Sequence, residues 1–148
     1  PMNRRPIAVG RTRVRFFASA KVRETPVEIR TNLWASIRLS TPAATLLDLI
    51  QHQQGGMDRL ALVAADLMPR ITAEDLLAGL DVAGSVPSAQ RLGFVFEHVG
   101  AGHLADVVAG WIDDKPMRAI DLEPGAGVSR KQSHRWRVRI NTRLEAVT

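Results

Sequence analysis

Residues 39–50 read Leu-Ser-Thr-Pro-Ala-Ala-Thr-Leu-Leu-Asp-Leu-Ile, and within them the hydrophobic pattern changes from that of a strand to that of a helix. Thr41 is a favourable N-cap, and Pro42 falls at the first helical position, where a missing N–H removes no intrahelical hydrogen bond. The leucines and Ile50 that follow form one helical stripe. This junction predicts strands before residue 41 and helices after it.

Two segments before the junction have strand patterns. In residues 11–17, three arginines alternate with apolar or β-branched residues, which is the period of a half-buried strand. The side chain of Phe16 should then point to the buried face, opposite the arginines. Residues 27–39 are more mixed, and we expect a hairpin or two short strands there, with Trp34 between them.

Four further helices are predicted after the junction. Their capping residues and stop signals place them at residues 57–68, 72–84, 85–100 and 102–112. A short strand is expected at residues 119–122, and a loop that contains Pro and two Gly at residues 123–133. Residues 135–141 form the clearest predicted strand, because arginines again alternate with apolar side chains.

The order of strands, helices and strands predicts an α+β fold. We expect about five helices grouped against a small antiparallel or mixed sheet, made from the N- and C-terminal strands. We expect residues 1–10 to be a linker or a cleavage remnant, and residues 11–148 to form one domain.

The two arginine-rich strands give the candidate binding residues. If they share a sheet in matching orientation, their six guanidinium groups lie on one face, where they would bind phosphates or the carboxylates of a protein partner. An ordinary amphipathic sheet with a solvated outer face would show the same alternation, so both interpretations stay open. The candidate nucleic-acid- or partner-binding residues are Arg11, Arg13, Arg15, Lys131, Arg135, Arg137 and Arg139.

Charge is distributed unevenly along the chain, which has a net charge of +5. Residues 1–40 hold nine basic and two acidic residues, residues 41–128 five basic and twelve acidic, and residues 129–148 six basic and one acidic. Basic ends thus enclose an acidic middle. This pattern favours a polyanion or a charged protein as partner, although a solvated surface in an arginine-rich protein is an equal alternative.

Several functions lack their usual sequence signals. The chain has no cysteine, so disulfides and thiolate zinc sites are excluded. No apolar run approaches the roughly 20 residues that span a bilayer, so we expect a cytoplasmic protein without membrane contact. The four histidines form no metal-binding motif, and no nucleophile, base or phosphate-loop pattern is recognisable. We therefore expect no catalytic residues, no metal and no cofactor.

Four segments together resemble the AbiEi family of bacterial antitoxins. Residues 39–50 are similar to the family's junction of a strand with Ser-Pro-Glu-Arg-Thr-Leu-Leu-Asp, and residues 54–58 to its Gly-Gly link to the next helix. Residues 90–97 resemble its Arg-Leu-Gly-Tyr-Leu-Leu-Glu helix. Residues 121–141 resemble its late Leu-Asp-Pro and its Trp-containing strand followed by Asn. The resemblance covers residues 11–146, but Ala43-Ala44 replaces the family's Glu-Arg, so no role of that pair is transferred.

The resemblance implies that residues 11–148 are the C-terminal domain of an antitoxin and transcriptional regulator, without the family's N-terminal winged helix. Members of the family belong to type IV toxin–antitoxin systems of abortive infection and phage defence. They counteract a nucleotidyltransferase toxin encoded nearby and repress their own operon. The C-terminal domain would carry the antitoxin activity and support binding of operator DNA. A stand-alone nucleic-acid-binding module that uses the arginine-rich face, and an unrecognised enzyme that modifies the toxin, are the alternatives.

The charge pattern offers two routes to a toxin. The acidic middle could cover a basic toxin surface, or the arginine face could bind an acidic one. Trp34 and Trp111 are candidate anchors, with a role in the core as the alternative for each. The acidic candidates are Glu74, Asp75, Asp81, Asp113 and Asp114.

Overall fold

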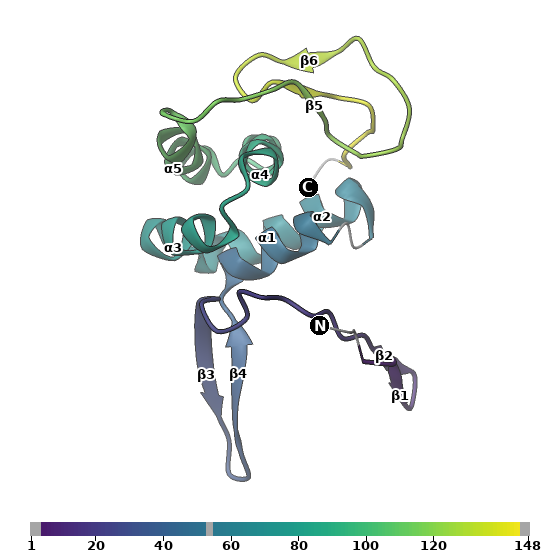
Figure 1. Cartoon of the computed structure of the whole chain (residues 1–148), viewed down its shortest axis with the longest axis vertical. Helices are drawn as coiled ribbons and strands as arrows, with labels where there is room; N and C mark the ends of the chain where they lie inside the picture. Colours follow the sequence, from purple (N-terminus) through teal and green to yellow (C-terminus); the bar gives the residue numbers. More distant parts are fainter. Residues whose placement is uncertain (1–3, 53–54, 146–148) are drawn as a thin grey trace.

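A computed structural model of the chain describes residues 4–52 and 55–145. Residues 1–3 of the expected linker and Gln54 of the Gly-Gly link lie outside the described residues. The helices form the middle of the molecule, and the strands lie on two opposite sides of them (Figure 1). In chain order the elements are β1 (Ile7–Val9), β2 (Thr12–Val14), β3 (Val27–Thr31), β4 (Ser36–Ser40), α1 (Pro42–Gln51), α2 (Gly56–Leu67), the 3-10 helix η1 (Met68–Arg70), α3 (Ala73–Ala83), α4 (Val86–His98), α5 (Gly102–Ile112), β5 (Ile120–Asp121), β6 (Gln132–Ser133) and β7 (Val138–Arg139).

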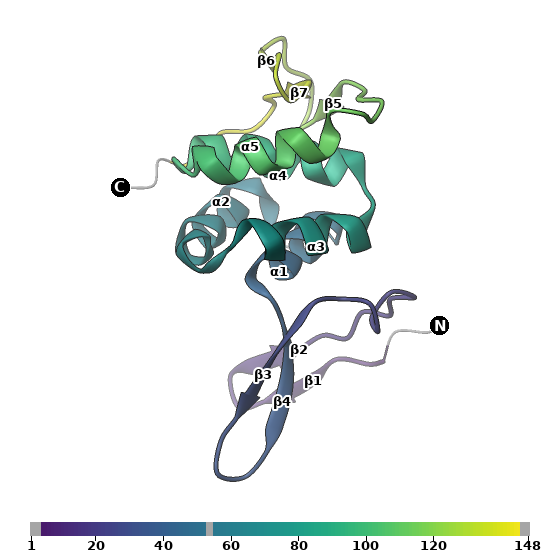
Figure 2. The same ribbon diagram turned by 90° about the vertical axis from the view of Figure 1, so that its left-hand side faces the viewer.

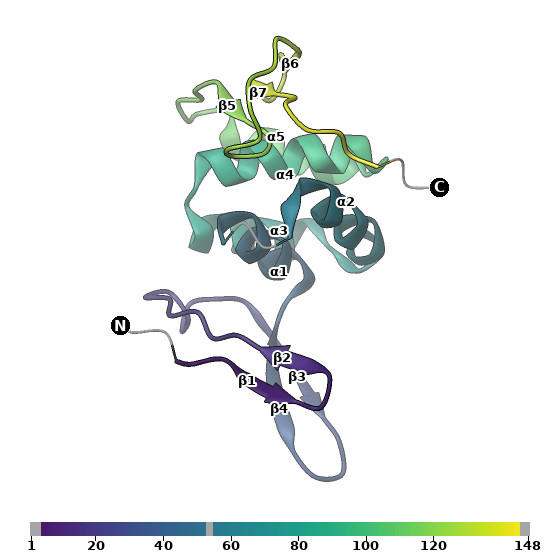
Figure 3. The same cartoon turned by 90° about the vertical axis from the view of Figure 1, so that its right-hand side faces the viewer.

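The fold is α+β with five α-helices in the described residues, as the sequence predicts. The strands, however, form three small sheets instead of one. Strands β1 and β2 form one antiparallel hairpin, β3 and β4 form another, and β5, β7 and β6 form a mixed sheet. Figures 2 and 3 show both hairpins below the helices and the mixed sheet above them. A strand at Ile7–Val9 also lies within the segment that was expected to be a linker.

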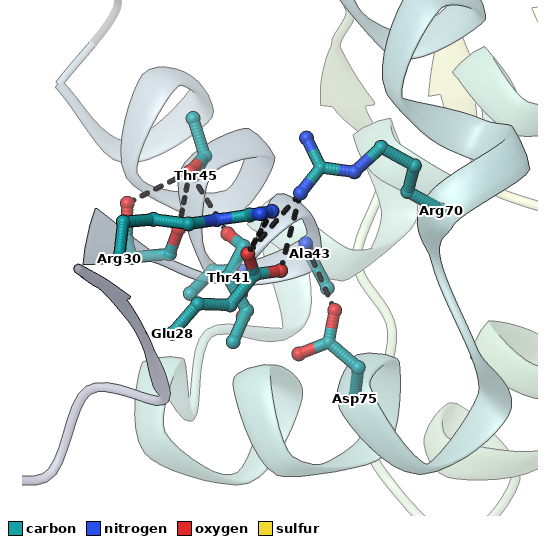
Figure 4. A network of polar contacts seen from close by, with 9 residues as sticks. Glu28, Arg30, Thr41, Ala43, Thr45, Arg70 and Asp75 are labelled. Atoms are coloured by element: carbon teal, nitrogen blue, oxygen red, sulfur yellow. Dashed lines mark hydrogen bonds and ion pairs between the residues drawn. The ribbon is translucent and has the colours of Figure 1, made fainter. Parts of the chain in front are cut away.

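Helix α1 is the centre of the core and packs against α2, α3 and α4. Its N-terminus is capped as the junction sequence predicts, because the Thr41 hydroxyl accepts a hydrogen bond from the Ala44 N–H. The Asp75 carboxylate on α3 accepts a second one from the Ala43 N–H at 3.2 Å (Figure 4). Fully buried side chains such as Leu46 and Phe96 fill the space between the helices.

The mixed sheet is fixed to α4 by two features of that helix. At Gly93, an added Cβ would lie only 2.2 Å from the Trp136 ring, so the missing side chain lets the indole rest on the helix. One turn earlier, the buried Gln90 donates hydrogen bonds to the carbonyls of Arg118 and Trp136 at 2.9 and 2.7 Å. Residues 90–97 and Trp136, which belong to two of the segments that resemble the family, are thus in direct contact.

The loop after β5 connects the C-terminal part to α2. The Glu123 carboxylate accepts a hydrogen bond from the Met57 N–H at 2.6 Å and so supplies an acceptor to the α2 N-terminus. Asn141 accepts from the Glu123 N–H at 2.9 Å and donates to the carbonyls of Glu123 and Gly127 at 2.8 and 3.1 Å. This amide therefore holds the loop in the position in which Glu123 reaches α2.

We expect the substitution Asn141→Ala to lower the free energy of unfolding by about 1–3 kcal/mol, because it leaves backbone groups of the loop without partners. Chemical denaturation measures this change. Asn141→Asp keeps the acceptor for the Glu123 N–H but turns a carboxylate oxygen toward the carbonyls of Glu123 and Gly127, so its stability should also be lower than that of the wild type. Equal stability of all three proteins would contradict this account of the loop.

Candidate functional site

The β3–β4 hairpin projects away from the helical body (Figures 1 and 2). Five residue pairs join its strands, from Val27 opposite Ser40 at the base to Thr31 opposite Ser36 near the tip. A two-stranded hairpin alone in water is only marginally stable, so a projecting one gains from a partner that covers it. This makes the hairpin the first candidate for a binding element.

The tip of the hairpin displays two large apolar side chains. Leu33 and Trp34 are 94% and 90% exposed. Asn32 orders the turn that carries them, because its side-chain oxygen accepts hydrogen bonds from the N–H groups of Trp34 and Ala35, both at 2.9 Å. The tip therefore presents Leu33 and Trp34 from a defined turn. Trp34 does not serve as a core residue, which was the alternative in the sequence analysis.

Apolar side chains also remain exposed along the sides of the hairpin. Opposite residues of an antiparallel pair share a face, so Val27 and Ile29 lie on one face, and Ile37 and Leu39 on the other. All four are exposed. Several exposed apolar side chains gathered on one projecting element favour an interaction site there.

The base of the hairpin is tied to the helices by an ion-pair network (Figure 4). The Glu28 carboxylate on β3 accepts from Arg30 at 2.8 Å and from Arg70 of η1 at 3.1 Å. Beside it, the Thr41 N–H donates to the carbonyl of Pro26 at 3.0 Å. These contacts restrain the direction in which the hairpin leaves the body.

The N-terminal arginines lie on the β1–β2 hairpin or next to it. Arg13 is in β2 opposite Ala8, Arg11 lies in the turn before β2, and Arg15 follows the strand. All three are exposed, and none has an ion pair or side-chain hydrogen bond within the described residues. Their charges are therefore available to a partner.

The C-terminal arginines are used differently. Arg135 bridges Glu97 on α4 and Asp106 on α5 at 2.5 and 2.6 Å, and its guanidinium lies 5.0 Å from the centre of the Trp136 ring. Arg139 pairs with Asp121 at 2.6 Å. Arg137 donates to the carbonyl of Met117 at 2.9 Å. Lys131 is exposed next to β6, and its N–H donates to the Ser129 hydroxyl at 3.1 Å.

The prediction that the six arginines share one face of one sheet is wrong. The N-terminal and C-terminal strands belong to separate sheets on opposite sides of the helices (Figure 3). Moreover, only Val138–Arg139 of the predicted strand 135–141 pairs in the sheet, because residues 134–137 form a turn with Arg137 at a positive φ of 50°. Trp136 and Val138, two of the apolar residues that alternate with the arginines, are nevertheless buried. Whether any of these arginines binds nucleic acid stays a prediction.

The ion pairs of the C-terminal arginines also shift pKa values. The hydrogen bonds that Arg135 donates to Asp106 and Glu97 raise the pKa of its guanidinium. The hydrogen bond between Arg139 and Asp121 lowers the pKa of that carboxyl and raises the pKa of the arginine. As permanently charged groups, Arg135 ties the turn before β7 to α4 and α5, and Arg139 ties β7 to β5 within the mixed sheet.

Most of the acidic candidates already have intramolecular roles. Asp81 accepts a hydrogen bond from the Trp111 indole N–H at 2.7 Å, and Asp114 pairs with Lys115 at 2.9 Å. The Lys115 ammonium also lies 4.2 Å from the centre of the Trp111 ring, so this half-buried tryptophan is less suited than Trp34 to anchor a partner. Glu74 and Asp113 are exposed.

Among the residues that the structure describes, no three His, Asp or Glu side chains gather in a way that could hold a metal ion. None of the helices in residues 4–52 and 55–145 has the length and apolar character needed to cross a membrane.

Comparison with known families identifies the class of protein. The sequence profile described as the AbiEi antitoxin C-terminal domain matches residues 1–98. The chain therefore belongs to this family and is an antitoxin domain, which implies a toxin as partner. No curated protein and no solved structure gives a significant match. The matched part contains both hairpins and helices α1 to α4.

The match ends at residue 98, but described residues beyond it share the same core. Leu104 and Val108 on α5, Leu122 after β5 and Trp136 are buried with the helices of the matched part. The described residues 99–145 thus pack onto the matched part through one hydrophobic core.

Proposed function

We propose that this domain neutralises a nucleotidyltransferase toxin in the cytoplasm by binding it directly, and that the β3–β4 hairpin is the toxin-binding element. The observation that carries the proposal is the exposed apolar tip, Leu33 and Trp34, on a turn ordered by Asn32. Membership of the antitoxin family supports the kind of partner.

The composition of the hairpin suits a protein partner. Tryptophan is enriched among residues that dominate binding energy, and Trp34 lies at the exposed apolar tip. The ordered turn lowers the entropy lost when the tip enters a pocket. A catalytic mechanism of neutralisation would need a reactive group, and none is recognisable in the sequence, so we propose binding and not enzymatic modification.

Co-expression of residues 1–148 with a nucleotidyltransferase toxin encoded beside the gene tests the proposal. We expect growth to be restored and a stable complex to co-purify. Growth rescue without a complex would instead favour enzymatic modification of the toxin. Absence of rescue by a domain that is folded, as judged by circular dichroism, would overturn the proposed function.

Support of operator DNA binding is a second candidate function, and the N-terminal arginines favour it. The side chains of Arg11, Arg13 and Arg15 have no ion-pair or hydrogen-bond partner among residues 4–52 and 55–145, so their guanidinium groups would be available to bind phosphates. The C-terminal arginines contribute less to this proposal, because Arg135 and Arg139 are already paired with carboxylates.

Reversal of Arg11, Arg13 and Arg15 to glutamate should weaken binding to duplex DNA. Each lost phosphate contact lowers the slope of log affinity against log salt by about 0.9, so three contacts would reduce it by about 2.7. Fluorescence anisotropy at several salt concentrations measures the slope. Reversal of Arg130 is the control, because this residue is exposed and lies two positions before β6, which is on the opposite side of the helices from β1 and β2. Equal slopes for wild type and the triple variant would leave these arginines without a role on DNA.

A further inference from the structure

A cleft of about 580 Å³ lies where the N-terminal segment, the base of the β3–β4 hairpin and helix α1 meet. Its size falls within the range of about 300–1,000 Å³ that is usual for small-molecule sites. The toxin-binding tip lies at the other end of the hairpin, so the cleft is a separate feature of the domain.

One side of the cleft suits a planar ring. The rings of Phe17 and His52 are stacked with their centres 5.0 Å apart and an angle of 25° between their planes. Val22, Val27 and Leu49 add apolar surface beside them. Aromatic side chains with apolar neighbours bind the flat face of a heterocycle through stacking and dispersion.

Another part of the cleft suits an anion. Arg23 on the N-terminal segment and Arg38 on β4 both line it, and neither guanidinium has an ion pair or hydrogen bond within the described residues. The planar, permanently charged guanidinium group binds phosphate oxygens well, and this cavity has two of them in its lining.

The third feature is a carboxyl group on the α1 wall. Asp48 lines the cleft, and partial burial raises the pKa of its carboxyl, while the charge of His52 opposes this shift. A carboxylate in this position can accept hydrogen bonds from the hydroxyls of a sugar or from the amino group of a base.

We propose that this cleft binds a nucleoside phosphate, with the base against Phe17 and His52 and the phosphate on Arg23 and Arg38. The ligand would be either a free nucleotide or the 5′-terminal nucleotide of an oligonucleotide, because both carry the same three groups. The proposal is independent of toxin binding, since it concerns the isolated domain.

Isothermal titration calorimetry of residues 1–148 with AMP, adenosine, inorganic phosphate and a 5′-phosphorylated dinucleotide tests the proposal. We expect AMP to bind at least tenfold more tightly than adenosine or phosphate, because only AMP uses both parts of the cleft. A dinucleotide that binds more tightly than AMP would identify an oligonucleotide end as the ligand, whereas equal affinity would identify a free nucleotide. Failure of both AMP and the dinucleotide to bind at millimolar concentration, or equal binding of AMP and phosphate, would overturn the proposal.

Variants locate the site. The double variant Arg23→Ser, Arg38→Ser should lose at least tenfold in AMP affinity. The control Arg59→Ser removes an exposed arginine on α2, outside the cleft, and should leave the affinity unchanged. Val22→Trp, at an exposed position on the rim, should block the cleft without disturbing the core. AMP binding that persists equally in all three variants would show that this cleft is not the site.

Discussion

Replacing Gly93 by alanine is expected to lower the free energy of unfolding by about 3 kcal/mol, at the upper end of what overpacking a core usually costs. The new Cβ would lie 2.2, 2.3 and 2.6 Å from three atoms of the Trp136 ring. The indole is 1% exposed and cannot move aside without disturbing the turn before β7. Thermal unfolding followed by circular dichroism should show a decrease in Tm of about 10 °C.

Gly110 provides a matched control in helix α5. A Cβ there would meet nothing within 4 Å, so Gly110→Ala should raise stability by about 0.5–1 kcal/mol through helix propensity alone. In the double variant Gly93→Ala, Trp136→Leu, the smaller side chain relieves the clash, so the two destabilising effects should not add. Full additivity in this cycle would show that Gly93 and Trp136 do not meet as described.

The helical part of the fold was predictable because its signals are local. Thr41, Thr72 and Ser85 accept hydrogen bonds from the N–H groups that an N-cap should satisfy, and the five helices lie close to their predicted ranges. The apolar periods then selected the faces that form the core. Each of these features depends on residues within a few positions of one another.

The arrangement of the strands was not predictable in the same way. Alternation tells which side chains share a face, but not which strand is the neighbour. The alternation at residues 135–141 reflects a turn and a short strand, and Trp136 is buried because Gly93, 43 positions earlier, leaves room for it. Nothing in residues 11–17 or 135–141 shows which strand lies beside each of them, so the sequence could not reveal that the two arginine patterns belong to separate sheets.

The exposure of Trp34 decides between the two roles that its position in the sequence allowed. Trp34 was an uncertain anchor because a tryptophan between two strands is compatible with either the core or the surface. The Asn32 turn could have been recognised from an asparagine that precedes the tip, since such side chains often cap tight turns. Arg23 and Arg38 carried no signal, because the cleft that they line forms only where the N-terminal segment, β4 and α1 meet in the folded chain.

The largest expected functional effect comes from Trp34→Ala, which should weaken toxin binding by about 30-fold or more. Loss of a tryptophan at the centre of an interface typically costs at least about 2 kcal/mol of binding free energy. Because the side chain is 90% exposed, the stability of the free domain should change by less than about 0.5 kcal/mol. Surface plasmon resonance against the toxin, with thermal unfolding of the same preparation, separates the two effects.

Two further variants test whether toxin binding depends on the ordered hairpin tip or on exposed apolar side chains in general. Val128→Ala removes an apolar side chain that is as exposed as Trp34 but lies in the loop on the opposite side of the helices, and it should leave toxin affinity unchanged. Asn32→Ala keeps both apolar side chains but releases the turn that orders them, so its affinity should fall between those of wild type and Trp34→Ala. If Trp34→Ala binds as tightly as wild type, the hairpin is not the toxin-binding element. If Asn32→Ala alone binds as wild type, contact with the tryptophan matters and its ordered presentation does not.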